Sequence, residues 1–304
     1  MPLLGTFAAG SSRGYGQKGG GPKFIVATGG TETTDGDYRI HTFTSPGTLC
    51  ISCGGNPLGS DKVEYLVVAG GGGGGQYINS VGWGGAGGAG GFRQSDGTTA
   101  GCYPVGNAPT ADLTTGVSGV SGLSGAISIG VGGGGGSNNP GANSTFGPIS
   151  STGGGHGNGA PSLPAGPGGG GGGGGGAGNA GGYSPPEGFP NAKGAGNGPF
   201  NDSVYLGAGY NRDGQNTLIQ GPFPTTTVGE PYNSSRWFAG GGGCIPAPQV
   251  QGGLGGAGNS GAPGNPGDAN TGGGGGAGGQ GGAPMTQPGG SGGSGVVILR
   301  YKFQ

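Results

Sequence analysis

The sequence has very little charge. Only 8% of its 304 residues are charged, and 11 basic residues nearly balance 12 acidic ones, which leaves a net charge of −1. A chain without a basic stripe offers no electrostatic footprint to the phosphates of nucleic acid or to an anionic membrane surface. Charge repulsion, a common cause of disorder in polar chains, is also excluded. We therefore expect no nucleic-acid partner.

The sequence also lacks long apolar runs and helix-forming segments. Hydrophobic residues make up 29% of the chain, too few for one large conventional core. No apolar run is long enough to span a bilayer, so we expect no membrane insertion. Glycine or proline interrupts every stretch that could become a long helix, so we expect essentially no α-helix. The first ten residues are apolar without a preceding basic region, which favours a docking arm over a signal peptide.

Residues that usually perform catalysis or bind metals are scarce. His41 and His156 are the two histidines, and neither has an acid or a nucleophile beside it in the sequence. Cys50 and Cys53 form a CxxC motif in a strand-like stretch, where positions i and i+3 point to opposite faces. We interpret them as small buried thiols and the acidic stretch 35–37 as a tight turn. The chain is thus not expected to be an enzyme, and we predict no catalytic residue, metal or cofactor.

Glycine is what the sequence has in abundance. There are 95 glycines and 24 prolines, and nine consecutive glycines run from Gly168 to Gly176. Glycine loses the most conformational entropy on folding and buries no side chain, so such a run is ordered only if the backbone itself packs. Collagen is excluded because no strict Gly-X-Y period runs through the chain. Glycine motifs of nucleotide-binding or hydrolase type carry no information against this background.

The glycines are grouped into tracts that recur along the chain. They lie at 70–75, 84–91, 132–136, 153–155, 168–176, 240–243, 252–258, 272–282 and 289–295. A polyproline-II-like helix has three residues per turn, a rise of about 3.1 Å and no internal hydrogen bonds. Neighbouring tracts without side chains can approach closely and satisfy each other's backbone groups. We expect polyglycine-II-like struts, the nine-glycine run among them; a β-sandwich with glycine-rich loops is the alternative, and both can coexist.

The strand signals suggest three parts in an all-β and irregular fold. Short β runs separated by Gly, Pro and Asp predict a small β module over 23–62. Two apolar strands, 63–69 and 295–301, bracket the glycine tracts, and their pairing would close the domain. The predicted organisation is a flexible docking arm at 1–22, the module, and a glycine-rich domain with variable loops at 63–304.

Aromatic residues gather in one of the segments between tracts, residues 183–239. Aromatics among Asn, Ser, Gly and Pro are typical of recognition loops. The same side chains could equally be the only core available between glycine struts, and the sequence leaves both interpretations open. The candidate receptor-contact residues are Tyr183, Phe189, Phe200, Tyr205, Tyr210, Phe223, Tyr232 and Trp237.

Seven short motifs follow one another along the chain. They are DYRIHTF at 37–43, SPGT at 45–48, EYLVVAGGG at 64–72, GWGGAGG at 82–88, ISIGVGG at 127–133, SSTGGGH at 150–156 and GSGVVILRY at 293–301. Their order resembles that of the glycine-rich domain of tailed-bacteriophage fibre and appendage proteins. The resemblance covers about residues 24 to 302, and its order of motifs is more specific than glycine content alone.

The resemblance implies a virion protein, often near the tip of a tail fibre. In T-even-like adhesins with glycine-rich tracts, glycine helices form a sandwich whose connecting loops contact host receptors. This chain differs from them in its arm and β module, so no receptor-contact position is transferred from that family. We expect a tail-fibre or tail-tip component that contributes to host-receptor recognition, on a tail appendage and not on the head. The alternative is a purely structural virion component, namely a capsid decoration, head fibre or baseplate element.

The expected partners follow from the same resemblance. The arm and the β module would bind other virion proteins, and the loops would bind a host cell-surface receptor. A fibre built on the symmetry of phage tails favours a homotrimer, whereas an adhesin on a trimeric shaft can be a single copy. A glycine-helix antifreeze protein would need regularly spaced Thr or Ala on a flat face, and the chain has irregular Asn, Pro and Tyr instead.

Overall fold

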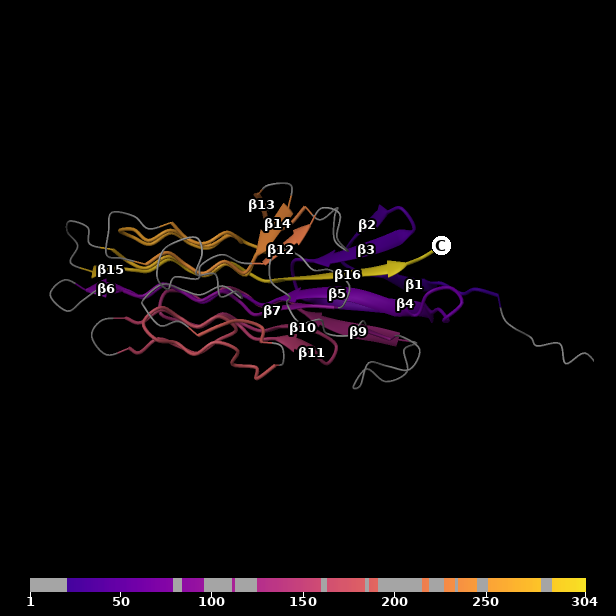
Figure 1. Cartoon of the computed structure of the whole chain (residues 1–304), viewed down its shortest axis with the longest axis horizontal. Helices are drawn as coiled ribbons and strands as arrows, with labels where there is room; N and C mark the ends of the chain where they lie inside the picture. Colours follow the sequence, from indigo (N-terminus) through magenta and orange to yellow (C-terminus); the bar gives the residue numbers. More distant parts are fainter. Residues whose placement is uncertain are drawn as a thin grey trace, which may run out of the picture.

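The computed structural model describes an elongated protein with a β-sandwich at one end and a body of glycine tracts at the other (Figure 1). The described residues are 21–78, 84–95, 111–112, 125–159, 163–183, 186–190, 215–218, 227–232, 235–244, 251–279 and 286–304. These residues contain strands, turns and extended backbone but no helix, which confirms the all-β prediction. Accordingly, no described helix is long and apolar enough to cross a membrane.

Two antiparallel sheets form the sandwich. The first contains, in spatial order, β1 (Ile25–Thr28), β4 (Gly47–Gly54), β9 (Gly125–Gly130), β10 (Ser144–Phe146) and β11 (Ile149–Ser151). The second contains β2 (Thr31–Asp35), β3 (Tyr38–Phe43), β16 (Val296–Lys302), β5 (Lys62–Val68) and β7 (Phe92–Gln94), and β8 (Ala111–Asp112) also pairs with β5. The segment 23–62 contributes strands to both sheets, because β4 pairs with β9 and β3 pairs with β16.

The two bracketing strands pair as the sequence predicted. Strand β16 lies antiparallel to β5, with Val296 opposite Val68 and Arg300 opposite Glu64. Both strands are nearly continuous apolar runs because both of their faces are covered, as in sheets buried on two sides. The start and the end of the glycine-rich region are therefore joined by one sheet.

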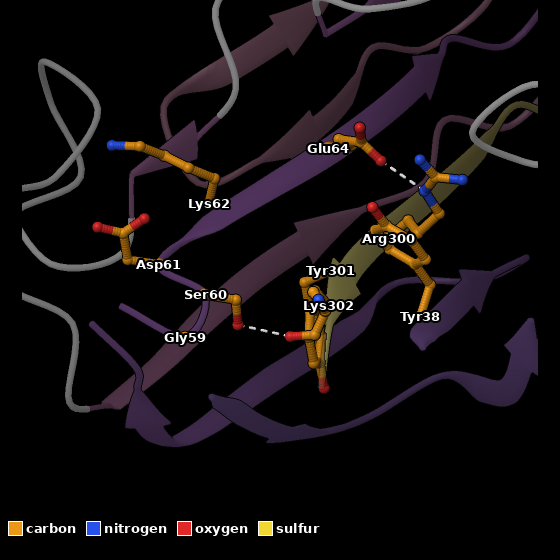
Figure 2. A pocket seen from close by; sticks show the side chains of 9 residues that line it. All are labelled: Tyr38, Gly59, Ser60, Asp61, Lys62, Glu64, Arg300, Tyr301 and Lys302. Atoms are coloured by element: carbon orange, nitrogen blue, oxygen red, sulfur yellow. Dashed lines mark hydrogen bonds and ion pairs between the residues drawn. The ribbon is translucent and has the colours of Figure 1, made fainter. Parts of the chain in front are cut away.

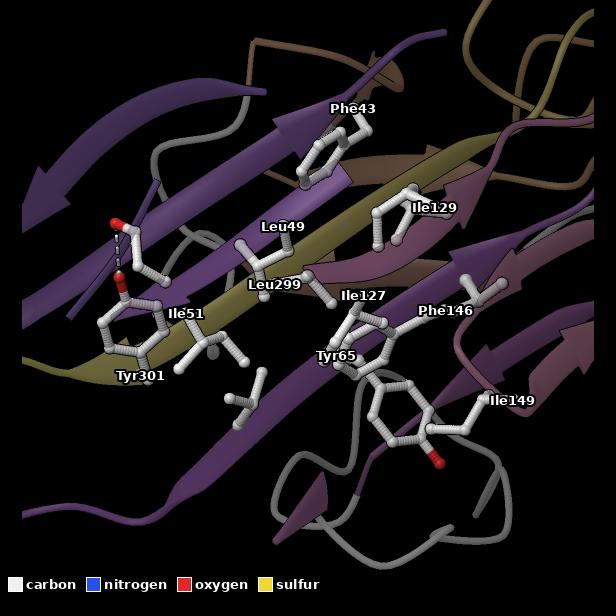
Figure 3. Close-up of a cluster of buried hydrophobic side chains, with 14 of the residues drawn as sticks. Phe43, Leu49, Ile51, Tyr65, Ile127, Ile129, Phe146, Ile149, Leu299 and Tyr301 are labelled. Atoms are coloured by element: carbon white, nitrogen blue, oxygen red, sulfur yellow. Dashed lines mark hydrogen bonds between the residues drawn. The ribbon is translucent and has the colours of Figure 1, made fainter. Parts of the chain in front are cut away.

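The sandwich core lies between the two sheets (Figure 3). Leu49 and Ile51 of β4 point into it from the first sheet, and Tyr65 of β5 and Leu299 of β16 meet them from the second. A second cluster covers the opposite face of the six-stranded sheet, where Phe238 packs on residues such as Leu66 and Ile298. Phe238 ends β14 (Ser235–Phe238), which pairs with β12 (Gln215–Leu218) and β13 (Glu230–Tyr232) in a separate three-stranded sheet.

The prediction of buried thiols is wrong for Cys50 and Cys53. In β4 the alternation places Leu49 and Ile51 in the core, so Cys50 is exposed on the outer face. Cys53 is half-buried next to the irregularity where β1 and β4 change register. Cys244 is a buried thiol, packed against Ala86. Cys102 lies outside the described residues.

A buried histidine links the strands at the edge of the sandwich. The Nδ1 atom of His41 is 2.7 Å from the carbonyl oxygen of Gly29, and its Nε2 atom is 2.9 Å from the hydroxyl of Tyr301. The Tyr301 hydroxyl also lies 3.3 Å from the carbonyl oxygen of Ala27. Burial lowers the pKa of His41, opposed by its hydrogen bond to Gly29 and by Glu32, and burial raises the pKa of Tyr301 to about 12.

We expect this histidine to make the protein less stable in acid. The unfolded chain protonates His41 below pH 6.5, whereas the folded chain holds it neutral down to a lower pKa. The contribution of neutral His41 to the free energy of unfolding is therefore fully present above pH 6.5. It is lost as the pH falls towards the folded pKa, by at most about 1.4 kcal/mol per pH unit. Urea unfolding between pH 5 and 8 measures this slope. His41→Gln should reduce the slope; equal slopes in wild type and His41→Gln would contradict the assignment.

The glycine tracts form polyglycine-II-like struts, as predicted. In the tract 70–75 the N–H groups donate to three different neighbouring segments in turn, so residues three apart share a neighbour. Residues 70 and 73 donate to the carbonyl groups of 142 and 139, residues 71 and 74 to those of 293 and 290, and residues 72 and 75 to those of 88 and 85. The carbonyl groups of the same tract accept from three more tracts, 135–138, 154–157 and 275–278. All twelve N···O distances are 2.6–3.0 Å. Six struts thus surround this one, and the period of three residues is that of polyproline II.

The tract 272–278 has the same environment. Its backbone bonds neighbours at 70–75, 87–90, 240–243, 258–261, 265 and 290–294. These bonds satisfy the backbone groups of a body that contains almost no side chains, and so they replace the missing hydrophobic core as the source of order.

The nine-glycine run is not a single strut, contrary to expectation. Gly170 and Gly173 donate to Ala89 and Ala86, which makes the middle of the run a strut. Gly174 and Gly175 then adopt φ angles of 106°, which side chains rarely tolerate, and turn the chain. The long run therefore combines a strut with the turn that ends it.

Candidate functional site

Four of the eight candidate aromatic residues lie in the described part of the chain. They are Tyr183, Phe189, Tyr232 and Trp237, whereas Phe200, Tyr205, Tyr210 and Phe223 lie outside the described residues. The four described residues occupy two places: Tyr183 and Phe189 lie between the sandwich edge and the glycine body, and Tyr232 and Trp237 belong to the three-stranded sheet.

Tyr183 is held in place by its neighbours. The Arg93 guanidinium lies 4.0 Å from the centre of its ring, and the same arginine donates to the carbonyl oxygen of Ser150 at 2.8 Å. Asn179 bonds both the N–H and the carbonyl group of Tyr183, at 3.1 and 2.9 Å. Phe189 is half-buried, and its carbonyl oxygen accepts a hydrogen bond from Gly171. These contacts fix both residues against the body.

Tyr232 is the described candidate that is most open to solvent. It is 48% exposed and makes an edge-to-face contact with Trp237, with the ring centres 6.4 Å apart. Trp237 is half-buried, and its indole N–H is buried without a hydrogen-bond partner among the described residues. The pair lies on a rigid sheet, since the next residue of β14, Phe238, is fully buried.

Two carboxylates, which sequence reasoning missed, tie this segment to the glycine body. Glu187 is 1% exposed; its Oε2 accepts from the N–H of Thr152 at 2.8 Å and from the hydroxyl of Ser151, and its Oε1 accepts from the N–H of Gly181 at 3.1 Å. Glu230 accepts from the N–H groups of residues 255 and 256 at 2.6 and 2.7 Å. The available signal was that each is an isolated acid in a stretch with little other charge.

The two ends of the molecule differ. The short strands β6 (Tyr77–Ile78) and β15 (Thr286–Gln287) pair at the free end of the glycine body, far from the C-terminus (Figure 1). In the sequence, residues 79–83 follow β6 and residues 280–285 precede β15. Asp268, between the tracts 252–258 and 272–282, is the one charged residue in the described stretch 251–279.

The opposite end, from which both described chain ends emerge, is charged and contains a pocket (Figure 2). The pocket has a volume of about 270 Å³ and lies at the ends of β3, β5 and β16. Its lining residues are Tyr38, Gly59, Ser60, Asp61, Lys62, Glu64, Arg300, Tyr301 and Lys302. No group of three or more His, Cys, Asp or Glu side chains among the described residues could hold a metal ion.

Comparison with known proteins identifies one family. A family model described as a glycine-rich domain matches residues 44–302, from the turn before β4 to the last residue of β16. No curated protein matches the sequence.

Proposed function

The chain belongs to the glycine-rich domain family, and from this premise we propose that it is a virion structural protein of a tailed bacteriophage. In this proposal it is a tail-fibre or tail-tip component that contributes to recognition of a host receptor. Other virion proteins hold the sandwich end, and the glycine body extends outwards.

The observation that carries the proposal is the polarity of the molecule. The described chain ends, the pocket and a concentration of charged side chains lie at the sandwich end, where a partner can attach. The other end is a nearly uncharged body of cross-bonded backbone. Because every strut is bonded to its neighbours, such a body is a rigid support for the connections it holds apart. Binding residues commonly lie on connections positioned by a rigid scaffold.

The proposal is tested by replacing connections without disturbing the scaffold. Deleting the whole 183–239 segment would also remove Glu187 and Phe238, which are buried supports. The better variants replace residues 245–250 or 280–285 with Gly-Ser segments of equal length. We expect virions to incorporate the variant normally, as measured by immunoblot, and to adsorb to the host at least about tenfold more slowly, which corresponds to losing one good contact.

The matched control replaces the six residues that follow β8 in the sequence, 113–118, and should leave adsorption unchanged. Normal adsorption with every replaced connection, in virions that contain the protein, would favour the purely structural role instead. Absence of the protein from purified virions, by mass spectrometry, would overturn the proposal as a whole.

A further inference from the structure

The strut at residues 132–136 lies at an edge of the glycine body. It continues β9, and the neighbouring strand β4 has no strut of its own beside it, because only the turn 44–46 separates β4 from β3. On its inner side the strut is bonded to the body. The N–H of Gly135 donates to Gly71 at 2.9 Å, and Gly292 donates to the carbonyl oxygen of Gly135 at 2.8 Å.

The outer side of this strut carries backbone groups without partners. Gly133, Gly134 and Gly136 are exposed, and within the described part of the chain none of their N–H groups donates a hydrogen bond. Within the same part, the carbonyl oxygen of Gly134 accepts none. Because Gly133 and Gly136 are three residues apart, their N–H groups point in one direction. The strut is thus comparable to an unpaired edge strand, which is a template for pairing with another chain.

Neither the fold nor the packing of the chain requires glycine at Gly133 or Gly136. Neither has a positive φ angle; a Cβ atom at Gly133 would have no neighbour within 4 Å, and one at Gly136 would make an ordinary contact, 3.8 Å from Asn139. The other exposed glycines of the described glycine body have a positive φ angle or no room for a Cβ atom; they are residues 134, 174, 175, 181 and 182. Close approach of a second backbone is a reason to keep glycine at such positions.

Several other outer segments of the body are closed to a further strut by proline. Proline has no N–H group to offer, and proteins use it to block the edge strands of sheets. The exposed prolines of these segments are Pro140, Pro164, Pro167, Pro263, Pro266 and Pro288. The strut 132–136 contains no proline, so its edge remains open to another chain.

We propose that this edge binds a segment of a partner polypeptide that is in the polyproline-II conformation and has glycine at every third position. Carbonyl groups of the segment accept from the N–H groups of Gly133 and Gly136, and one of its own N–H groups donates to the carbonyl oxygen of Gly134. Such segments are already extended before they bind, so little conformational entropy is lost.

The segment 264–268 shows how a strand of this chemistry packs on the same body. The N–H groups of Gly264 and Gly267 donate to the carbonyl oxygens of Pro288 and Ser291, at 3.0 and 2.8 Å. A Cβ atom at Gly264 would lie 2.3 Å from a backbone oxygen, whereas the two residues between the glycines are exposed. Glycine is therefore needed at every third position of a docked segment, and the other positions are free to vary.

Amide hydrogen exchange of the full chain tests whether the edge is open. We expect Gly133 and Gly136 to exchange like unprotected amides, and Gly132 and Gly135 to be protected, since these donate to Ser144 Oγ and to Gly71. Protection of Gly133 and Gly136 in dilute protein would show that the edge is already covered and would overturn the inference. Protection that develops only as the protein concentration rises would identify a second copy as the occupant instead, and would overturn the proposed partner.

Binding is tested with the peptide acetyl-(Gly-Asn-Pro)3-amide, about 28 Å long, which repeats the sequence of residues 264–266. We expect saturable NMR shifts of the amide signals of 133–136 and slower exchange of Gly133 and Gly136. The matched peptide acetyl-(Ala-Asn-Pro)3-amide should bind much more weakly, because its Cβ atoms prevent close approach. Absence of saturable shifts with the glycine peptide, or equal binding of the two peptides, would contradict the proposal.

Variants separate docking from folding. Gly133→Pro combined with Gly136→Pro removes two donors that are unbonded within the described chain, so it should leave Tm nearly unchanged and weaken peptide binding at least about tenfold. If the proline variant folds poorly, Gly133→Ala combined with Gly136→Ala makes the same test through its Cβ atoms. Pro167→Ala, on another outer segment, is the control and should bind like wild type. Wild-type binding by a folded double variant would refute the inference. That the partner belongs to the virion rests on the proposed function, whereas peptide binding by the isolated protein does not, so the two can fail separately.

Discussion

Gly72→Ala is expected to lower the free energy of unfolding by about 3 kcal/mol or more, or to prevent folding of the glycine body. A Cβ atom at Gly72 would lie 2.2 Å from the carbonyl oxygen of Gly155 and 2.5 Å from its carbonyl carbon. The obstacle is backbone, and it cannot move aside easily, because Gly155 also bonds Gly88 and Gly170. The clash would therefore spread through several struts.

Gly133→Ala is the matched control. Gly133 belongs to an outer strut, and a Cβ atom there would have no neighbour within 4 Å. We expect it to be neutral or slightly stabilising, by about 0.5 kcal/mol, because alanine reduces the entropy of the unfolded chain. Thermal unfolding of both variants by circular dichroism or calorimetry decides the matter. A Gly72→Ala protein as stable as Gly133→Ala would show that the struts are less closely packed than the structure has them.

Glu187→Ala is expected to cost about 3–5 kcal/mol, because it removes a buried carboxylate on which three hydrogen-bond donors depend. The N–H groups of Thr152 and Gly181 and the hydroxyl of Ser151 all depend on this one carboxylate. The donors belong to separate segments, so their loss would loosen the junction between the sandwich edge, the strut 153–158 and the segment that carries Tyr183.

Glu187→Gln removes the negative charge of the side chain and keeps its size and shape. The amide keeps one acceptor oxygen and replaces the other with a donor, which would face the N–H group of Thr152 or of Gly181. We expect an intermediate loss of stability in urea unfolding, smaller than that of the alanine variant. Glu230→Ala should cost less than Glu187→Ala, since Glu230 is only half-buried. A Glu187→Ala variant within 1 kcal/mol of wild type, about the size of an ordinary surface change, would contradict this account.

The backbone architecture could be predicted because glycine allows few ordered states. Once helices, collagen and charged disorder were excluded, cross-bonded struts, a β-sandwich or both remained, and the apolar strands at 63–69 and 295–301 identified the closing pair. Outer struts were harder to find, because only their inward positions must be glycine. In 261–268, Gly264 is buried while Pro263 and Pro266 are exposed, so a search for glycine runs misses this strut.

The site residues could not be predicted in the same way. Glu187 and Glu230 look alike in the sequence, since each stands between a glycine and a proline. Their roles depend on backbone N–H groups brought to them by distant segments, such as Thr152 for Glu187 and residues 255 and 256 for Glu230. No local pattern encodes these contacts, since the struts that create them are chemically almost identical.

The period of three residues in the struts also restricts which insertions and deletions the gene can tolerate. Adding or removing one residue within the tract 70–75 would turn all later N–H groups by about 120°, so each would face the neighbour meant for the next residue. A change of three residues restores every pairing and alters only the length. Insertions and deletions inside the struts should thus survive selection in units of nine nucleotides, while the connections at the free end can lengthen or shorten by any number of codons.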